Sequence, residues 1–185
     1  MDYDRKKLGW HFVGATLRDG RPIPPDGEWL IHHGHAKMCE AGLHLGITPC
    51  DALEYAPGET LCLVEYADEV DREGGKILCR RRRIIARMDA TEVLWYFARM
   101  QAVSVLDLWT ACPPDAVLDY LMTGADMDAA YSASVSASVS VSASASASVS
   151  VSAWARAWAR AWASASASAS ESFNALVYEC FEDWL

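Results

Sequence analysis

From Ser132 to Ser172 the chain alternates residue by residue, and no other feature limits its possible folds as strongly. Every even position in this stretch is Ser, Trp or Arg, and every odd position from Ala133 to Ala169 is Ala or Val. A period of two is the strand period, because successive side chains point to opposite faces. We therefore expect residues 131–170 to form a repetitive β-structure with Ala and Val inside and Ser outside.

Several conformations compete for this stretch. A single strand of this length would run roughly 130 Å at ~3.3 Å per residue, far beyond ordinary strands, so the β-structure must fold back as a narrow solenoid. The alternative is a long α-helix of about 60 Å, which Ala favours. Disorder is the third possibility, since Ser/Ala tracts often stay unfolded. The absence of turn residues weighs against β, and the unbroken alternation weighs for it.

An island of large side chains interrupts the small residues of the repeat. Its members are Trp154, Arg156, Trp158, Arg160 and Trp162. On a strand they share one face, where each guanidinium can stack between indoles as a Trp–Arg ladder. On a helix the Trp stripe and the Arg pair lie on opposite sides. We expect the island either to pack against the protein's own domain or C-terminal helix, or to contact a partner, a glycan or a nucleic-acid single strand. For the tail as a whole we expect homo-oligomers or self-assembly.

The residues outside the repeat predict an α+β domain over 1–125, strands first and helices after. We expect strands at Leu8–Val13, Glu28–His33, Thr60–Tyr66 and Lys76–Met88, with an acidic turn between the last two. The first helix covers Thr48–Tyr55, with Thr48 as N-cap and Pro49 at the first helical position. Two later helices run from Thr91 to about Trp109 and from Pro113-Pro114 to Gly124. Residues 171–185 form an amphipathic helix that we expect to cap the solenoid.

Composition narrows the function classes. The net charge of −9 argues against nucleic-acid binding, which needs a basic face. No run of about 18 apolar residues exists, so we expect no membrane span. The start MDYDRKK precedes no export signal, and the six cysteines form no CxxC pair, so we expect reduced thiols in the cytoplasm.

Two clusters outside the repeat are candidate sites. Arg80, Arg81, Arg82 and Arg83 lie in an expected strand, with Arg81 and Arg83 on one face. They form either a charged edge strand or a clamp for an anion. His33, His35 and Cys39 are the weak candidates for metal ligands, but their spacing matches no zinc motif, so we expect no metal. No cofactor motif or complete catalytic set is present, and we expect no cofactor.

The run from Met38 to Val70 resembles a family of phage and prophage proteins of unknown function. The matching positions are Cys39, Glu40, Gly42, Leu43, His44, Pro49, Asp51, Ala52, Leu53, Tyr55, Val64 and Glu65. The resemblance covers roughly residues 8–90 and extends to the alternating tail. It implies a mobile-element origin and a host bacterial cytoplasm, and it supplies no activity.

Residues 8–90 are also similar in layout to ADP-ribosyltransferase domains. WHFVG resembles their opening strand, GLHLGITPCDALEYA their next segment, and TLCLVEYADEV the strand that follows. The likeness implies that His11 holds a ribose and that Tyr55 packs near it. His44 replaces the family's Tyr, and no catalytic Glu follows Lys76.

Two functions follow from these patterns. We expect a non-enzymatic, phage-associated structural or interaction protein whose repeat is a scaffold. The alternative is a binding domain for a small nucleotide or another small molecule, such as a transferase relic or a sponge for a host-defence signal. That version would use His11, His44, Tyr55 and Arg80–Arg83, and a host protein is a further possible partner.

Overall fold

The computed structural model describes residues 3–104, 106, 113–138 and 167–185. The chain forms two units: residues 1–93 together with 160–185, here called the sheet unit, and residues 94–159, the helical unit. The chain therefore leaves the sheet unit after its last strand and returns to it with its C-terminal helix. Strands and helices are both present, which confirms the mixed class predicted from the sequence.

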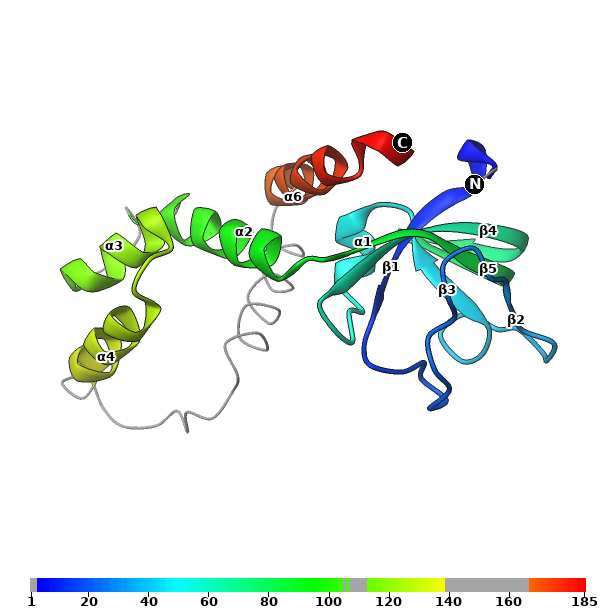
Figure 1. Cartoon of the computed structure of the whole chain (residues 1–185), viewed down its shortest axis with the longest axis horizontal. Helices are drawn as coiled ribbons and strands as arrows, with labels where there is room; N and C mark the ends of the chain where they lie inside the picture. The colour runs from blue at the N-terminus through cyan, green and yellow to red at the C-terminus, as the bar shows by residue number, and fades with distance from the viewer. Residues whose placement is uncertain (1–2, 105, 107–112, 139–166) are drawn as a thin grey trace. The chain divides into compact units, whose positions relative to one another are not determined.

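One antiparallel sheet organises the sheet unit (Figure 1). Its strands are β1 (Leu8–Val13), β2 (Leu30–Ile31), β3 (Leu43–Gly46), β4 (Thr60–Glu73) and β5 (Lys76–Asp89), preceded by the 3₁₀ turn η1 (Arg5–Lys7). They follow the order β2-β5-β3-β1-β4, and β4 pairs with β5 as well. The pairings among β1, β3, β5 and β4 thus form a closed ring, so these four strands curve around a common interior.

The hairpin of β4 and β5 is longer than predicted. The strand expected over Thr60–Tyr66 continues to Glu73, and the chain turns at Gly74 and Gly75, where Gly74 has φ +55°. The acidic segment predicted as a turn is instead a strand with an irregularity between Glu69 and Asp71. Its side chains from Asp68 to Glu73 are exposed, so the backbone ladder continues without needing apolar residues there.

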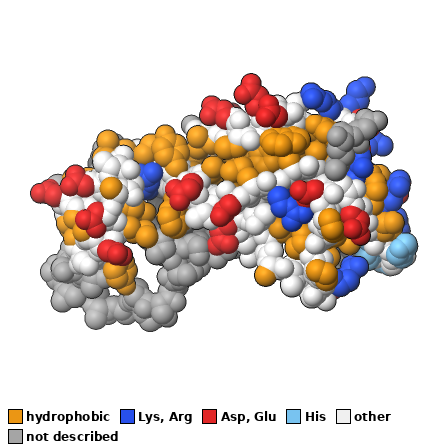
Figure 2. Space-filling view, in the orientation of Figure 1, with side chains coloured by type: hydrophobic (Ala, Val, Ile, Leu, Met, Phe, Trp, Pro, Cys, Tyr) orange, Lys and Arg blue, Asp and Glu red, His pale blue; other side chains and the backbone are white. Residues whose placement is uncertain are grey.

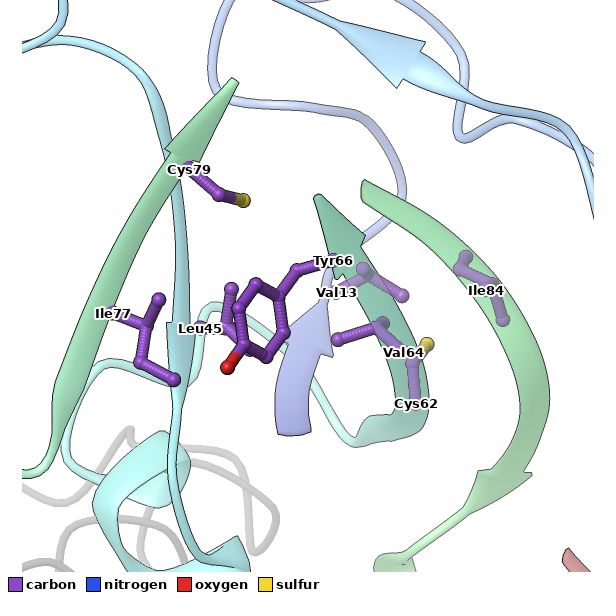
Figure 3. Close-up of a cluster of buried hydrophobic side chains, with 8 residues drawn as sticks. All are labelled: Val13, Leu45, Cys62, Val64, Tyr66, Ile77, Cys79 and Ile84. Atoms are coloured by element: carbon purple, nitrogen blue, oxygen red, sulfur yellow. The ribbon is translucent and has the colours of Figure 1, made fainter. Parts of the chain in front are cut away.

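The interior of the ring holds a cluster of buried side chains from β1, β3, β4 and β5. Figure 3 shows its eight members: Val13, Leu45, Cys62, Val64, Tyr66, Ile77, Cys79 and Ile84. Burial raises the pKa of the thiols of Cys62 and Cys79 to about 11, so both act as small apolar side chains. Both are free, as are Cys39, Cys50 and Cys180 among the described residues.

Helix α1 (Pro49–Leu53) begins where the sequence predicted. The Thr48 side chain accepts a hydrogen bond from the Asp51 amide, and the Asp51 carboxylate accepts one from the Thr48 amide at 2.9 Å. This reciprocal capping box satisfies two amides that a helix start leaves unpaired.

The C-terminal helix α6 (Ala167–Cys180) and the 3₁₀ turn η3 (Glu182–Trp184) also belong to the sheet unit. Phe173, Val177 and Phe181 recur at a spacing of four and are fully or almost fully buried. The Phe181 ring meets the Trp10 ring edge-on, with centroids 5.0 Å apart. The C-terminal helix therefore packs on β1 and α1, whereas the expectation that it caps a solenoid concerns residues 139–166, which lie outside the described residues, and stays a prediction.

The two ends of the described chain are tied together in the same unit. The Tyr3 hydroxyl donates to the Trp184 carbonyl at 2.6 Å, and the Arg5 guanidinium donates to the Leu185 carbonyl at 2.7 Å. These bonds fix the turn after α6 beside the turn that precedes β1.

The helical unit contains most of α2 (Thr91–Ser104), together with α3 (Asp115–Thr123) and α4 (Met127–Ser138). The predicted helix between Pro114 and Gly124 is confirmed, and Gly124 ends it in the left-handed conformation with φ +77°. The Asp126 side chain accepts from the Ala129 amide at 3.2 Å and so caps the start of α4.

The described ends of the alternating stretch are helical. Residues 131–138 continue α4, and residues 167–172 begin α6, so the β prediction is wrong at both ends. Helix α4 starts before the alternating stretch, and the amphipathic part of α6 follows it. Both helices extend into the stretch because it is rich in Ala, which has the highest helix propensity. Residues 139–166, with the Trp/Arg island, lie outside the described residues, and the solenoid stays a prediction there.

Candidate functional site

A cleft of about 300 Å³ opens in the sheet unit. Its walls come from the middle of β1, the end of β3, α1 and the start of β5. Its lining residues are His11, Arg18, Cys39, His44, Leu45, Gly46, Asp51, Ala52, Tyr55 and Lys76. The structure thus brings together three residues that the ADP-ribosyltransferase resemblance selected: His11, His44 and Tyr55.

His11 faces the cleft because β1 alternates. Trp10 and Phe12 are buried on the face that includes the Trp10 contact with α6, and His11 points to the opposite face with Val13. Burial holds the pKa of His11 well below its usual value, and Arg82 and then His44 lower it further. Among the described residues neither ring nitrogen of His11 has a hydrogen-bond partner. His11 therefore offers a neutral imidazole that can donate and accept.

His44 is held by the backbone around it. Its Nε2 accepts a hydrogen bond from the Cys39 amide at 3.1 Å, which requires a lone pair on that nitrogen and so fixes the ring as the neutral Nδ1–H form. Burial lowers the pKa of His44, and the Arg82 charge adds to the effect, while the Gly42 backbone opposes it. Cys39 adopts φ +61°, a rare conformation for a residue with a side chain, as it places this amide.

Arg82 places a buried positive charge behind the two imidazoles. Its side chain donates to the His44 carbonyl, and the residue is only 6% exposed. Burial lowers the pKa of Arg82 to about 10, so the guanidinium is still charged at neutral pH. None of the ion pairs among the described residues includes Arg82. A buried charge without a counter-ion is costly and raises the positive potential of the cleft.

Lys76 and Tyr55 form the opposite part of the rim. The Lys76 ammonium lies 3.5 Å from the centroid of the Tyr55 ring and 3.8 Å from the Cys39 sulfur. The Tyr55 hydroxyl donates to Glu54 at 2.6 Å, which orients the ring. The ring thus holds the ammonium at the edge of the cleft through a cation–π contact.

Charges in the cleft do not cancel. Asp51 is its one lining carboxylate among the described residues, and Thr48 already occupies that group with its amide and its hydroxyl, at 2.9 and 2.7 Å. Arg18 and Lys76 carry two positive charges, and Arg82 adds a third nearby. Since the whole chain has a net charge of −9, this is a local excess of positive charge on an acidic protein.

The four consecutive arginines do not form one clamp. Arg81 and Arg83 share a face, as their spacing predicted, and both lie over the Trp29 ring, at 5.3 and 4.9 Å from its centroid. Each also pairs with a carboxylate at 2.6 Å: Arg81 with Asp68, and Arg83 with Glu65. Arg80 donates to the Gly34 carbonyl at 2.7 Å. None of the four arginines lines the cleft, but Arg82 lies behind it, where its guanidinium donates to the backbone carbonyl of the lining residue His44.

The edge-strand interpretation of this run is wrong. Arg81 and Arg82 pair with β2 on one side, through Ile31 and Leu30, and with β4 on the other. A residue run with partners on both sides is interior to the sheet. The charges are tolerated there because three of the four side chains reach exposed or half-buried positions, and only Arg82 is buried.

The weak metal candidates are not brought together. Strand β2 ends at Ile31, so His33 and His35 lie in the loop after it and share no strand face. Cys39 lies in the cleft instead. In the described ranges, no group of three or more His, Cys, Asp or Glu residues could hold a metal ion.

Sequence reasoning did not select Arg18 and Lys76. Arg18 lies in the turn from Leu17 to Gly20, Lys76 follows the turn at Gly74 and Gly75, and neither residue belongs to a motif. Asp51 could have been found, because its spacing from Thr48 is that of a capping box. The island from Trp154 to Trp162 lies outside the described residues, so self-assembly and a scaffold role stay predictions.

Residues 8–95 match the model of a family described as Domain of unknown function (DUF7666). A domain of unknown function therefore covers this N-terminal part, whereas the phage association and the motif of the resembling family stay predictions. Searches of curated proteins and of solved structures gave no match. In the part of the chain that the structure describes, no helix is long and apolar enough to cross a membrane.

Proposed function

We propose that the sheet unit is a binding domain for an anionic small molecule, of the class of nucleotides and other phosphorylated compounds. One observation carries the proposal: Arg18 and Lys76 line a cleft of about 300 Å³ whose one lining carboxylate among the described residues is already engaged, and the buried Arg82 lies behind its His44 wall. Electrostatic attraction selects anions at such a place, even on a protein of negative net charge. The alternative function of the sequence analysis is thus the one that the cleft supports.

The distribution of basic residues agrees with this location. All Lys and Arg residues of the chain except Arg99, Arg156 and Arg160 precede residue 94. Figure 2 shows most of the Lys and Arg side chains on the visible face over the sheet unit. Several of them are neutralised by carboxylates, as in the pairs Arg21–Asp19 and Arg87–Asp26, so the cleft is distinguished by cations without such partners.

The size and lining of the cleft suit a ligand with both charge and polar edges. A volume near 300 Å³ is at the lower end of small-molecule sites. Lys76 and Arg18 can bind phosphate oxygens, and the neutral imidazole of His11 can bind a hydroxyl or carbonyl group. Tyr55, which is 53% exposed, adds an aromatic surface at the rim.

The same geometry supports binding rather than a particular reaction. The Nε2 of His44 is engaged by the Cys39 amide, and Asp51 is engaged by Thr48, so among the described residues His11 lacks a carboxylate that would orient it as a base. A complete acid–base pair needs such a partner in most enzymes. The proposed role is therefore capture of the ligand.

Calorimetric titration with ADP and with inorganic pyrophosphate tests the proposal. We expect binding that Lys76→Gln weakens by about tenfold, since one charge-assisted contact is worth about 1.5 kcal/mol or more. Lys6→Gln removes the same charge from exposed η1 and serves as the control, with unchanged affinity. Absence of binding of both probes, or equal loss in the two variants, would contradict the proposal.

A further inference from the structure

The start of α1 is supported by a residue more than 120 positions away. The amide of Cys50 lies in the first turn, where a helix leaves its N–H groups without internal partners. It donates to the side-chain oxygen of Asn174 on α6 at 2.9 Å. The Cys50 thiol donates to the Ser170 hydroxyl, one turn earlier on α6, at 3.4 Å.

Helix α1 depends on these contacts because it is short. Its five residues make hardly more than one turn, and an isolated helix of that length is not stable in water. The capping box of Thr48 and Asp51 fixes the start of α1 to its own loop. Asn174 fixes the same turn to α6, which is anchored in turn by the buried Phe173 and Val177.

The supported helix forms one wall of the cleft. Asp51 and Ala52 lie in α1, and Tyr55 follows it directly. Opposite them, Gly46 of β3 lies so close to α1 that an added Cβ would be 2.4 Å from the Ala52 nitrogen. Because strand and helix are in contact with no spare space, a small displacement of α1 changes the position of Tyr55 and of the Lys76 ammonium over it.

We propose that Asn174 is a positioning residue for the cleft: by capping α1 from the C-terminal helix, it sets the wall against which the ligand binds. This inference rests on the proposed function and adds to it a role for the last helix of the chain. The hydrogen bond of Asn174 is to the Cys50 amide, so Asn174 acts on the cleft through the backbone of α1.

The test uses the full chain and ADP as the probe. We expect Asn174→Ala to weaken ADP binding by about fivefold, the size of a lost helix cap. Asn174→Asp keeps an acceptor in the same place and adds a charge that favours a helix start, so its affinity should stay within about twofold of the wild type. Glu179→Gln, at an exposed position of α6, is the matched control and should leave binding unchanged.

A second measurement does not need the ligand. Hydrogen exchange of residues 48–56 should accelerate in Asn174→Ala and return toward the wild-type rate in Asn174→Asp, while the strands β4 and β5 keep their protection. If Asn174→Ala does not fold, Asn174→Gln serves instead, because its longer side chain keeps the amide but displaces the accepting oxygen.

The outcomes separate the two proposals. If the wild type binds ADP and Asn174→Ala binds it equally well, the positioning role is overturned and the proposed function stands. If the wild type binds neither ADP nor pyrophosphate, the proposed function fails. Hydrogen exchange then tests, without a ligand, whether Asn174 stabilises α1. Unchanged exchange of residues 48–56 in Asn174→Ala would overturn the inference that it does.

Discussion

The guanidinium of Arg82 donates a hydrogen bond to the backbone carbonyl of His44, which places a buried cation directly behind the wall of the cleft. Electrostatic repulsion from this charge lowers the pKa of both His11 and His44, in addition to the effect of burial. A single residue of the sheet thus helps to keep two cleft histidines neutral.

Arg82→Met should raise the pKa of both histidines. The substitution keeps most of the side-chain volume and removes the repulsion between guanidinium and imidazolium, whereas the effect of burial on His11 and His44 remains. Titration of the imidazole protons by NMR measures the change. Arg80→Met is the control, because it removes a charge two residues away on the same strand. Equal pKa shifts in both variants would argue against the specific role of Arg82.

Stability should fall in mild acid because of His11. Its pKa is lower in the folded protein than the usual value of about 6.5 in an unfolded chain. Below that value the unfolded state binds more protons, so the free energy of unfolding decreases as the pH falls toward the folded pKa. Urea unfolding between pH 7 and pH 5 measures the slope. His11→Gln should flatten it, and an unchanged slope would assign the effect to other groups.

Gly46→Ala should destabilise the sheet unit by about 1–3 kcal/mol, as overpacking does. The new Cβ would lie 2.4 Å from the Ala52 nitrogen and 2.9 Å from the Thr48 carbonyl oxygen, and both are backbone atoms that cannot rotate away. Gly14→Ala is the matched control, because its nearest neighbour would be at 3.6 Å. Urea unfolding compares the two, and equal stability would mean that α1 can move away from β3.

The Trp–Arg ladder predicted for the alternating stretch has its own test. Replacing Arg156 and Arg160 by Glu should weaken a ladder strongly, because a carboxylate meets the negative face of each indole. The same two changes on a helix should cost little. Hydrogen exchange, Trp fluorescence and oligomer size are the measurements, with the pair of Arg→Lys changes as the control that keeps the charge. If nothing changes, the ladder is wrong and a helical repeat becomes the better model.

Local signals in the sequence predicted much of the sheet unit. The limits of β1 and the start of α1 follow from alternation and from the Thr48 cap, which act over a few residues. The run to Glu73 could not be predicted in this way, because β4 is extended by pairing with β5 rather than by its own apolar residues. The helical ends of the alternating stretch were missed for a related reason: adjoining helices at Met127 and Phe173 override a pattern that favours strand.

The cleft was only partly predictable. His11, His44 and Tyr55 were selected by resemblance, and the structure gathers them around one cavity. Arg82 could not be separated from its three neighbours, since burial inside the sheet, rather than sequence, distinguishes it. The contact between Asn174 and Cys50 spans 124 residues and has no local signature at all.

The return of α6 to the sheet unit has a consequence for evolution of the repeat. Because α6 packs on β1 and the turn after it is tied to Tyr3 and Arg5, residues 94–159 form an excursion with both ends attached to one body. Doubling the number of residues between two fixed ends costs only about 0.6 kcal/mol in the loop-closure relation. A change in the number of Ser-Ala pairs therefore costs the sheet unit little, because the cleft and α6 are held by contacts within that unit.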